Sequence, residues 1–504
     1  MHTDRRGFIK FVVAGSVAAG CPVNEALVAA PEPVRPAVDG EQNEICHRVR
    51  DGHQFSRPAA SLRHDIVIVG GGMSGLSAAW FLRDQDFLLL EKEDHWGGNA
   101  YLEEYQGQAF ATGSAYGNTT GTVADFCGEI GLKILPVADP DGLILNREFV
   151  PHAWRGGLDR LPYPKSVRES FQKFKRDMLK VGLVSRAREL DAKPLSDLLK
   201  DYAPELKVWW DNYGPSNWGA ASADTSALVA LGDFQEFAGN EPDDRATFAG
   251  GLGAISKRLS ERLLETHRER LLGGATSVAV EHGKSDVSVT YVHEGQVKAV
   301  TAKAAIMAAP KFIARRLVAG LPKVQQEAMH KLRYAPYPVV NVIFNKPVFN
   351  GGYDTWCPGN TFTDVIVADW VIRHQPGYRQ KNNILTFYTP LKEAERAKLL
   401  TEEGARDLAA SVLRDWQKLL PGSNVDPVEV HIYRRGHPMF MAAPETYTKW
   451  IPAARQAMER VFFANTDSTG PVSMTSGAIE ASRRAIGEMR RMLDGKPASA
   501  RSAA

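Results

Sequence analysis

Residues Asp65–Ala100 read DIVIVGGGMSGLSAAWFLRDQDFLLLEKEDHWGGNA. The run Asp65–Val69, which is uncharged and β-branched after its first residue, predicts a buried strand, and Met73–Leu82 is composed of residues that favour a helix. A second apolar run, Phe87–Leu90, predicts another buried strand. Strand, helix and strand in this order form a βαβ unit, which indicates an α/β domain with a parallel sheet.

The turn between the first strand and the helix is rich in glycine. Three of its glycines have the spacing G-x-G-x-x-G, where a side chain would block the tight turn or the approach of a pyrophosphate. The phosphates would lie at the helix N-terminus, whose free N–H groups and dipole favour an anion. The residues expected to hold them are Gly70, Gly72, Met73, Ser74 and Gly75.

An acidic residue closes the second strand. Glu91 falls about twenty residues past the first glycine, where a carboxylate can accept hydrogen bonds from the ribose hydroxyls of an adenosine. We place the neighbouring Lys92 in the same part of the site. Strand, helix, glycine spacing and terminal acid together predict a dinucleotide-binding domain of the Rossmann type.

Length and composition exclude several classes of protein. The chain of 504 residues is long enough for two or three packed domains. Its net charge of +2 and the absence of a basic stripe with interleaved aromatic residues argue against nucleic acid as a partner. The four cysteines form no C-x-x-C pair and no Cys/His cluster, so neither a metal site nor a disulfide framework is expected.

The N-terminus is typical of an exported protein. Arg5 and Arg6 precede a mildly apolar stretch, Phe11–Gly20, which resembles a twin-arginine signal and is too short to span a bilayer. We expect residues 1–30 to engage the twin-arginine translocon and direct the folded protein to the periplasm; an ordinary basic N-terminus is the alternative. Lipidation of Cys21 stays open. Residues 31–62, rich in proline, alanine and charge, are interpreted as a linker.

The pair Gly97-Gly98 indicates which dinucleotide is bound. A nicotinamide-binding domain does not need a glycine pair after its acidic residue, whereas the flavin amine oxidase superfamily has one that lies against the flavin and the pyrophosphate. The segment resembles the FAD-binding motif of that superfamily, which includes monoamine oxidases, protoporphyrinogen oxidases and phytoene desaturases. Asn99 stands where the superfamily usually has arginine.

Later segments resemble the same superfamily in the same order. The helix after 248–255 and the strands that follow it imply a backbone contact to adenine at Val278, and residues 112–116 imply that Gly113 and Ser114 lie beside the flavin ring. The stretch 460–482 resembles the closing motif of the superfamily. The resemblance assigns its carboxylate, Asp467, to the ribityl or pyrophosphate region, and it places the backbone of Met474 and Thr475 at the flavin pyrimidine.

The resemblance implies an α/β fold in which a Rossmann-like FAD-binding domain carries an inserted α+β substrate-binding domain. We expect the FAD-binding domain to comprise 63–118, 246–322 and 451–492. The substrate-binding domain would then comprise 119–245 and 323–450, and a disordered tail would follow at 493–504. No cysteine stands near the closing motif, so the FAD is expected to be bound without a covalent link.

The resemblance also implies the reaction. An FAD-dependent oxidoreductase of this type removes a hydride from an amine or a related small molecule and passes the electrons to oxygen or another acceptor. The superfamily lysine that lies near flavin N5 is missing from the matching stretch 334–344, where Asn341 is the polar candidate. His437, by residue type, is the expected general base, and Tyr433 lies in the same segment.

Two other functions stay open on the sequence alone. Without the lysine, the protein could be an FAD-dependent desaturase or isomerase that acts on carbon–carbon bonds of an apolar substrate. Asn99 and the missing lysine also leave room for a flavin-fold protein that binds a partner without catalysis.

Overall fold

The computed structural model describes residues 34–138, 141–239, 244–373, 375–470 and 472–495. The predicted signal segment, with Arg5, Arg6 and Cys21, lies outside the described residues, as does 496–504 of the predicted tail. Residues Arg35–Ala504 group into one compact unit by their contacts. Across the described ranges, none of the helices is both long and apolar enough to cross a membrane.

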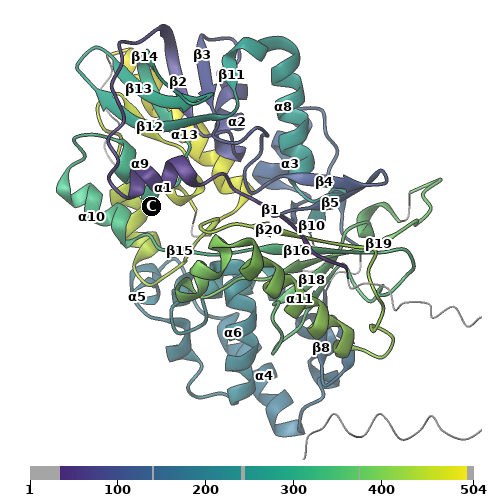
Figure 1. Ribbon diagram of the computed structural model, residues 1–504. Coiled ribbons are helices and arrows are strands. Elements are labelled where there is room, and N and C mark those ends of the chain that lie inside the picture. The colour runs from purple at the N-terminus through teal and green to yellow at the C-terminus, as the bar shows by residue number, and fades with distance from the viewer. Residues whose placement is uncertain (1–33, 139–140, 240–243, 374, 471, 496–504) are drawn as a thin grey trace, which may run out of the picture. The chain divides into compact units, whose positions relative to one another are not determined.

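The predicted βαβ unit opens a seven-stranded sheet (Figure 1). Strand β2 pairs in parallel with β3 on one side and with β14 on the other, and β14 also pairs in parallel with β22. The strands, in order across the sheet, are β11 (Leu271–Leu272), β3 (Phe87–Leu90), β2 (Leu62–Val69), β14 (Gln296–Met307), β13 (Val287–His293) and β12 (Ala275–His282), with β22 (Val461–Phe463) on β14. Because 66–69 of β2 and the whole of β3 are buried on both faces, these residues are apolar without alternation.

Helices cover both faces of this sheet. Alternate strand residues such as Ile66 and Ile68 pack with the helices α2 (Met73–Phe81), α3 (Gly121–Glu129), α8 (Gly253–His267) and α13 (Thr475–Leu493). The opposite face packs with α9 (Lys311–Leu317), α10 (Lys323–Lys331) and α12 (Ile451–Ala454). Helices α3 and α10 therefore belong to this first domain, although the predicted boundaries gave both to the substrate-binding domain.

A second domain is built on an eight-stranded sheet (Figure 1). Its strands, in order, are β1 (Ala37–Gly40), β20 (Glu429–Arg434), β16 (Val339–Phe344), β19 (Asn383–Tyr388), β18 (Asp364–Val367), β17 (Asp354–Trp356), β8 (Asp141–Leu145) and β9 (Glu148–Pro151). A cluster rich in tryptophan and phenylalanine unites the helices α4 (Lys165–Met178), α6 (Pro204–Trp218) and α7 (Ala227–Gly239). The short helix α5 (Ala187–Asp191) precedes α6, and α11 (Glu402–Leu419) packs on β16 and β20.

Short two- and three-stranded sheets complete the fold. They are β4 (Leu102–Tyr105) with β5 (Gln108–Ala111), β15 (Tyr334–Ala335) with β21 (Met439–Phe440), and β10 (Arg245–Thr247) between β6 (Gly117–Asn118) and β7 (Leu135–Pro136). Strands β15 and β21 lie where the chain passes between the two domains, because Tyr334 and Phe440 pack in the core of the first domain.

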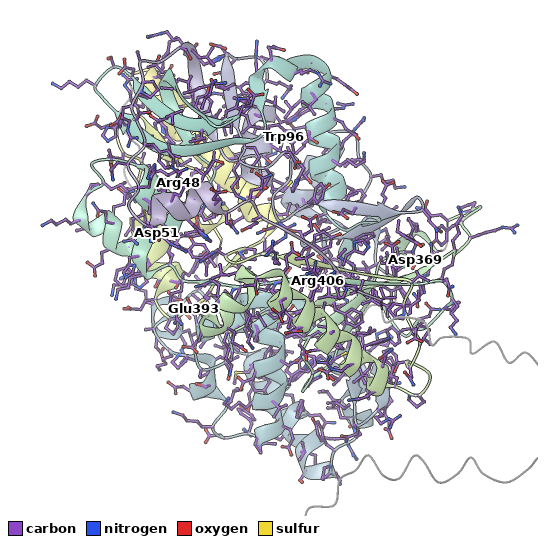
Figure 2. The ribbon with its side chains drawn as sticks, in the orientation of Figure 1. Arg48, Asp51, Trp96, Asp369, Glu393 and Arg406 are labelled. Atoms are coloured by element: carbon purple, nitrogen blue, oxygen red, sulfur yellow. The ribbon has the colours of Figure 1, made fainter. Side chains whose placement is uncertain are left out.

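The linker predicted for 31–62 is wrong in its described part. Strand β1 adds in parallel to the edge of β20, and Nε of Arg406 in α11, labelled in Figure 2, donates to the carbonyl of Pro36 at 3.2 Å. Helix α1 (Glu44–Arg50) then packs against β12 of the first domain. The composition of this segment resembles a linker because edge pairing satisfies the backbone without requiring an apolar side chain at each position.

Candidate active site

The glycine turn has the geometry that the sequence predicts. Gly70 follows β2 with φ of 106°, and Gly72 precedes the first turn of α2. A Cβ on Gly75 would lie 1.7 Å from the carbonyl oxygen of Gly70, so only glycine allows the helix to pack this closely on the turn. A Cβ on Gly72 would meet nothing closer than the Cα of Gly98 at 3.9 Å, so the backbone at this position leaves room for a group to approach closely.

The start of α2 retains unused hydrogen-bonding capacity. Within the described residues, no side chain caps this helix. The hydroxyl of Ser74 is buried and has no hydrogen-bond partner there. Buried polar atoms are normally satisfied, so Ser74 and the free N–H groups of the first turn form a donor set suited to a phosphate oxygen.

Glu91 lies directly against the glycine turn. Its carboxylate accepts hydrogen bonds from the backbone N–H of Gly71 at 2.5 Å and of Glu93 at 2.9 Å. Burial raises the pKa of Glu91, and the nearby Lys92 and the two N–H donors oppose this rise. Lys92 itself pairs with Glu93. Glu91 thus lies at the strand end as predicted, and its bond to a ribose stays a prediction.

The glycine pair packs against the glycine turn. The backbone of Gly97 bridges to Gly72, and its N–H donates to the carbonyl of Gly71 at 2.9 Å. Gly98 has φ of 57°, and its Cβ would lie 3.2 Å from the Cα of Gly72. Trp96, labelled in Figure 2, packs over Gly71, where its ring would be 2.6 Å from an added Cβ. The pair therefore allows two backbone segments to cross in contact.

Asn99 is uncharged, but a positively charged side chain lies beside it. The guanidinium of Arg435, which follows β20 in the second domain, donates to the carbonyl of Gly98 at 2.7 Å and to Oδ1 of Asn99 at 3.2 Å. Nδ2 of Asn99 donates to the carbonyl of Pro438 at 2.8 Å. The residue after the glycine pair thus ties this loop to the second domain.

A cavity of about 2500 Å³ is lined by both domains. Gly113 and Ser114 line it from the first domain, and the N–H of Ser114 donates to the carbonyl of Asn99 at 2.9 Å. Met474 and Thr475 line it at the start of α13, where the described residues provide no side-chain cap. The two segments that the resemblance places at the flavin ring therefore share one cavity with Asn99 and Arg435.

Two further predicted cofactor residues lie away from this cavity. Val278 is buried in β12 at a bulge, where the register with β13 shifts between Ser277 and Ala279. Asp467 is also buried, and its oxygens accept bonds from Nζ of Lys311 at 2.6 Å and from the hydroxyl of Tyr334 at 2.5 Å. The predicted role of Asp467 at the ribityl or pyrophosphate group is therefore not supported, because Lys311 and Tyr334 hold both of its oxygens.

None of the predicted catalytic residues lines the cavity. Asn341 is buried in β16, where it donates to the carbonyl of Ala111 at 3.1 Å and accepts a bond from Thr386 at 2.6 Å. Tyr433 is buried and donates to Glu103 at 2.6 Å. Asn341 and Tyr433 therefore stabilise the fold, because neighbouring groups of the protein already bond their polar atoms.

His437 also lies outside the cavity. Its ring packs on Phe312 with 4.6 Å between centroids. Burial, together with the positive charge of Arg396, lowers the pKa of His437 to about 4. The expected general base therefore faces the first domain and does not point toward the space between Gly113 and Thr475. The chain turns at Gly436, so Arg435 lines the cavity and His437 does not.

Buried carboxylates that the sequence did not predict also line the cavity. Asp364 of β18 accepts a bond from the hydroxyl of Thr363 at 2.5 Å, and burial raises its pKa to about 7. The hydroxyl of Ser216 also bonds Asp364 and lies 2.6 Å from the hydroxyl of Tyr337. The only sequence signal was a single acidic residue in an apolar strand.

A second buried carboxylate lies among the aromatic side chains. Asp233 accepts bonds from the hydroxyl of Tyr213 at 3.0 Å and from Nε1 of Trp218 at 2.9 Å, and it lines the same cavity. Burial raises its pKa to about 6. Among the described ion pairs, neither Asp233 nor Asp364 has a lysine, arginine or histidine partner. The cavity thus combines aromatic walls with carboxylates that titrate near neutral pH.

A flavin dinucleotide fits the residues of this site. The glycine turn leaves an open approach at Gly72, the hydroxyl of Ser74 is buried without a partner, and Nε of Arg435 is likewise buried without one. Ser74 and Arg435 each provide a hydrogen-bond donor, and the backbone at Gly72 provides N–H groups. These donors suit the phosphates of a dinucleotide. The cavity beyond Gly113 and Thr475 is large enough for the ring and a substrate.

Fold and site define a two-domain flavin-dependent oxidoreductase. The model of the family of flavin-containing amine oxidoreductases matches residues 73–489, and the chain belongs to this family. The predicted family, α/β fold and enzyme class are thereby confirmed. A flavin cofactor is implied by the family.

Individual relatives are distant in sequence. The chain is 23% identical to oxidoreductase PigB of Serratia sp. (strain ATCC 39006), over 84% of this chain and 75% of that protein. It is 24% identical to human flavin-containing amine oxidase B, over 84% of this chain and 86% of that protein. Cyclohexylamine oxidase from Brevibacterium oxydans IH-35A has a similar structure, with a TM-score of 0.68 and 18% identity over 86% of this chain and 99% of that chain. The structural similarity supports the fold.

Proposed function

We propose that the protein is an exported, FAD-dependent amine oxidoreductase that removes a hydride from the carbon next to the nitrogen of a small amine. The observation that carries this proposal is the presence of Asp364 and Asp233 in an aromatic cavity that also contains the predicted flavin-side residues. A buried carboxylate without a cationic partner is costly, and a protonated amine would offset that cost.

Asp364 is suited to accept a proton from the ammonium group of such a substrate. Its pKa of about 7 lets it exist as a carboxylate that binds an ammonium group and as an acid that has accepted a proton from it. The amine nitrogen then carries the lone pair needed for loss of a hydride from the adjacent carbon. When bound, the flavin accepts that hydride and later passes the electrons to oxygen or another acceptor.

The aromatic walls would position the substrate. Tyr337 and Tyr388 line the cavity beside Asp364, and the hydroxyl of Tyr388 donates to the carbonyl of Gly113 at 2.6 Å. Tyrosine and tryptophan rings bind the carbon chain of an amine through apolar contact and its charge through their faces. Human amine oxidase B and cyclohexylamine oxidase, by their names, act on amines, which supports the same substrate class for this chain.

The experiment is a reduction assay on purified holoenzyme. Bleaching of the flavin absorbance by members of a panel of amines, with release of hydrogen peroxide in air, is the expected result. Amino acids and polyenes serve as comparison substrates. Bleaching by a polyene with no response to amines would contradict the proposal.

One observation favours a second candidate, a desaturase of carbon–carbon bonds. Strand β16 reads VVNVIF and contributes Val339 to the cavity, so the strand that carries a lysine in typical amine oxidases has none here. An apolar substrate does not require a group that receives an amine proton. The same panel distinguishes the two functions, and a flavin that no compound bleaches would favour a non-catalytic binding protein.

We also propose that the FAD is bound without a covalent link. Cys46, Cys127 and Cys357 are free, and none of them lines the cavity. Acid precipitation of the holoenzyme should release the yellow cofactor into the supernatant. Colour that stays in the pellet would contradict this proposal.

Export through the twin-arginine pathway, to the periplasm, is proposed from Arg5, Arg6 and the apolar stretch after them. This pathway suits an enzyme that folds around its cofactor before crossing the membrane. Replacement of both arginines by lysine should leave flavin-loaded protein in the cytoplasm, whereas unchanged export would contradict the proposal. Mass spectrometry of the exported protein would show whether Cys21 carries a lipid.

A further inference from the structure

Arg435 crosses from one domain to the other. It follows β20 of the second domain, yet its guanidinium contacts the first domain at the carbonyl of Gly98, at Oδ1 of Asn99 and at the hydroxyl of Thr112, at 2.7, 3.2 and 3.0 Å. Only 7% of the residue is exposed. All three acceptors are uncharged, so they orient the guanidinium without neutralising it.

The positive charge of Arg435 has no anionic partner at contact distance among the described residues. No aspartate or glutamate forms a described ion pair with it, and its Nε is buried without a hydrogen-bond acceptor. The carboxylates of Glu41 and Glu93 act on it only electrostatically, and burial lowers its pKa. A buried charge that no opposite charge at contact distance neutralises is costly, even where uncharged acceptors bond part of the group.

The place of this charge indicates which anion it meets. Gly98, whose carbonyl accepts from Arg435, packs directly against Gly72 of the glycine turn. The free N–H groups of α2 begin at the same turn. Arg435 also lines the large cavity with Asn99, Ser114 and Thr475. It therefore stands beside the path from the glycine turn to the flavin end of the site.

We propose that Arg435 is the charged side chain that binds the pyrophosphate of FAD, supplied from the second domain to a loop in which Asn99 follows the glycine pair. The proposal rests on the binding of FAD proposed above. A guanidinium can donate to two phosphate oxygens at once, and Nε is the donor that still lacks a partner. Because the side chain belongs to the second domain, the cofactor would join the two domains through it.

The experiment measures the affinity of the apoprotein for FAD, FMN and riboflavin through quenching of flavin fluorescence. Arg435→Gln should weaken FAD binding about 10- to 100-fold, as expected for the loss of a charge-assisted hydrogen bond. Riboflavin, which has no phosphate, should lose less than about twofold, since only phosphate contacts are removed. Arg434→Gln is the matched control, because Arg434 precedes Arg435 in sequence and does not line the cavity; it should leave all three affinities unchanged.

Two further variants keep the proposal testable if Arg435→Gln folds poorly. Arg435→Lys retains the charge and should bind FAD more tightly than Arg435→Gln. Asn99→Arg in the Arg435→Gln background returns a guanidinium to the same loop and should restore at least part of the FAD affinity. Circular dichroism of each apoprotein reports folding separately from cofactor binding.

Equal losses for FAD and riboflavin, or an unchanged FAD affinity in a folded Arg435→Gln protein, would overturn the proposal. A wild-type apoprotein that binds no flavin at all would instead contradict the proposed function. The two failures are thus distinguishable in one set of titrations.

Discussion

Nζ of Lys311 lies 2.6 Å from Oδ1 of Asp467, and neither side chain is exposed to solvent. The hydroxyl of Tyr334 and the backbone N–H of Lys311 bond the other carboxylate oxygen, at 2.5 and 2.8 Å. These contacts join the start of α9 to the segment between β22 and α13. The carboxylate that the closing motif predicts for the cofactor is thus part of a buried ion pair.

Replacement of Asp467 by asparagine should therefore act mainly on stability. The variant leaves the buried ammonium of Lys311 without its counter-ion, and loss of one partner of a buried pair costs about 3–5 kcal/mol. Denaturant unfolding of the apoprotein measures this. Glu261→Gln, which breaks the exposed pair with Lys257, is the control and should cost less than about 0.5 kcal/mol. A folded Asp467→Asn protein of full stability that no longer binds FAD would restore the predicted cofactor role.

Two glycine substitutions should separate cofactor binding from folding. Gly72 has ordinary backbone angles, φ −71° and ψ −174°, and free space around its Cβ position, so Gly72→Val should fold. Its branched side chain would occupy the approach of the pyrophosphate and weaken FAD binding by at least about tenfold, the effect of losing one charge-assisted hydrogen bond. Gly75→Ala should instead destabilise the apoprotein, because its Cβ would overlap the carbonyl of Gly70. Fluorescence titration and thermal unfolding distinguish the two effects.

Asp364→Asn should slow reduction of the flavin by an amine at least about a hundredfold while the bound flavin keeps its spectrum. As a base, Asp364 acts in its deprotonated form, so wild-type kcat/KM should fall as the pH drops below about 7. This decrease in kcat/KM at acidic pH should be absent in the Asp364→Asn variant. Asp233→Asn, in the same cavity, is the matched comparison. If only Asp233→Asn removes the decrease in kcat/KM at acidic pH, the base is Asp233, whose pKa is about 6.

The raised pKa of Asp364 also predicts a dependence of stability on pH. The folded protein holds this proton to about pH 7, whereas an unfolded aspartate releases it near pH 3.8. Between these values the folded state binds more protons, so the contribution of Asp364 to stability is greatest below pH 3.8 and is lost as the pH rises to 7. Relative to wild type, Asp364→Asn should gain thermal stability between pH 5 and pH 8. A difference in Tm that does not change with pH would contradict the assignment.

His437→Asn should leave the rate of flavin reduction within about twofold of wild type, since general-base catalysis contributes far more than this where it operates. The imidazole packs on Phe312 outside the cavity and, with a pKa of about 4, is neutral at pH 7. Stopped-flow reduction by an amine is the measurement. The lowered pKa means that the unfolded state takes up a proton below pH 6.5 and the folded state only near pH 4, so His437 should reduce stability as the pH falls through this range. A reduction rate lowered a hundredfold would return His437 to the role of base.

The nucleotide-binding half could be predicted because its signals are local. Gly70, Gly75 and Glu91 lie within one βαβ unit, where spacing along the chain fixes position in space. The glycine pair was recognised for the same reason, although its packing on Gly72 needed the structure. Strand β1, in the described part of the predicted linker, could not be predicted because it is defined by its partner strand and not by its own residues.

The sequence by itself determined the family, the α/β fold and the positions of the glycine turn and glycine pair, because these depend on backbone conformation that only certain residues permit. Only the tertiary structure decided which side chains face the cavity. Asp364 and Asn341 both lie in apolar strands, yet one lines the cavity and the other braces a backbone carbonyl. Arg435 and His437 are two residues apart, and the turn between them sends one toward the cofactor site and the other onto Phe312. A side chain's surroundings come from strands and loops distant in sequence, so residue type and spacing alone do not specify them.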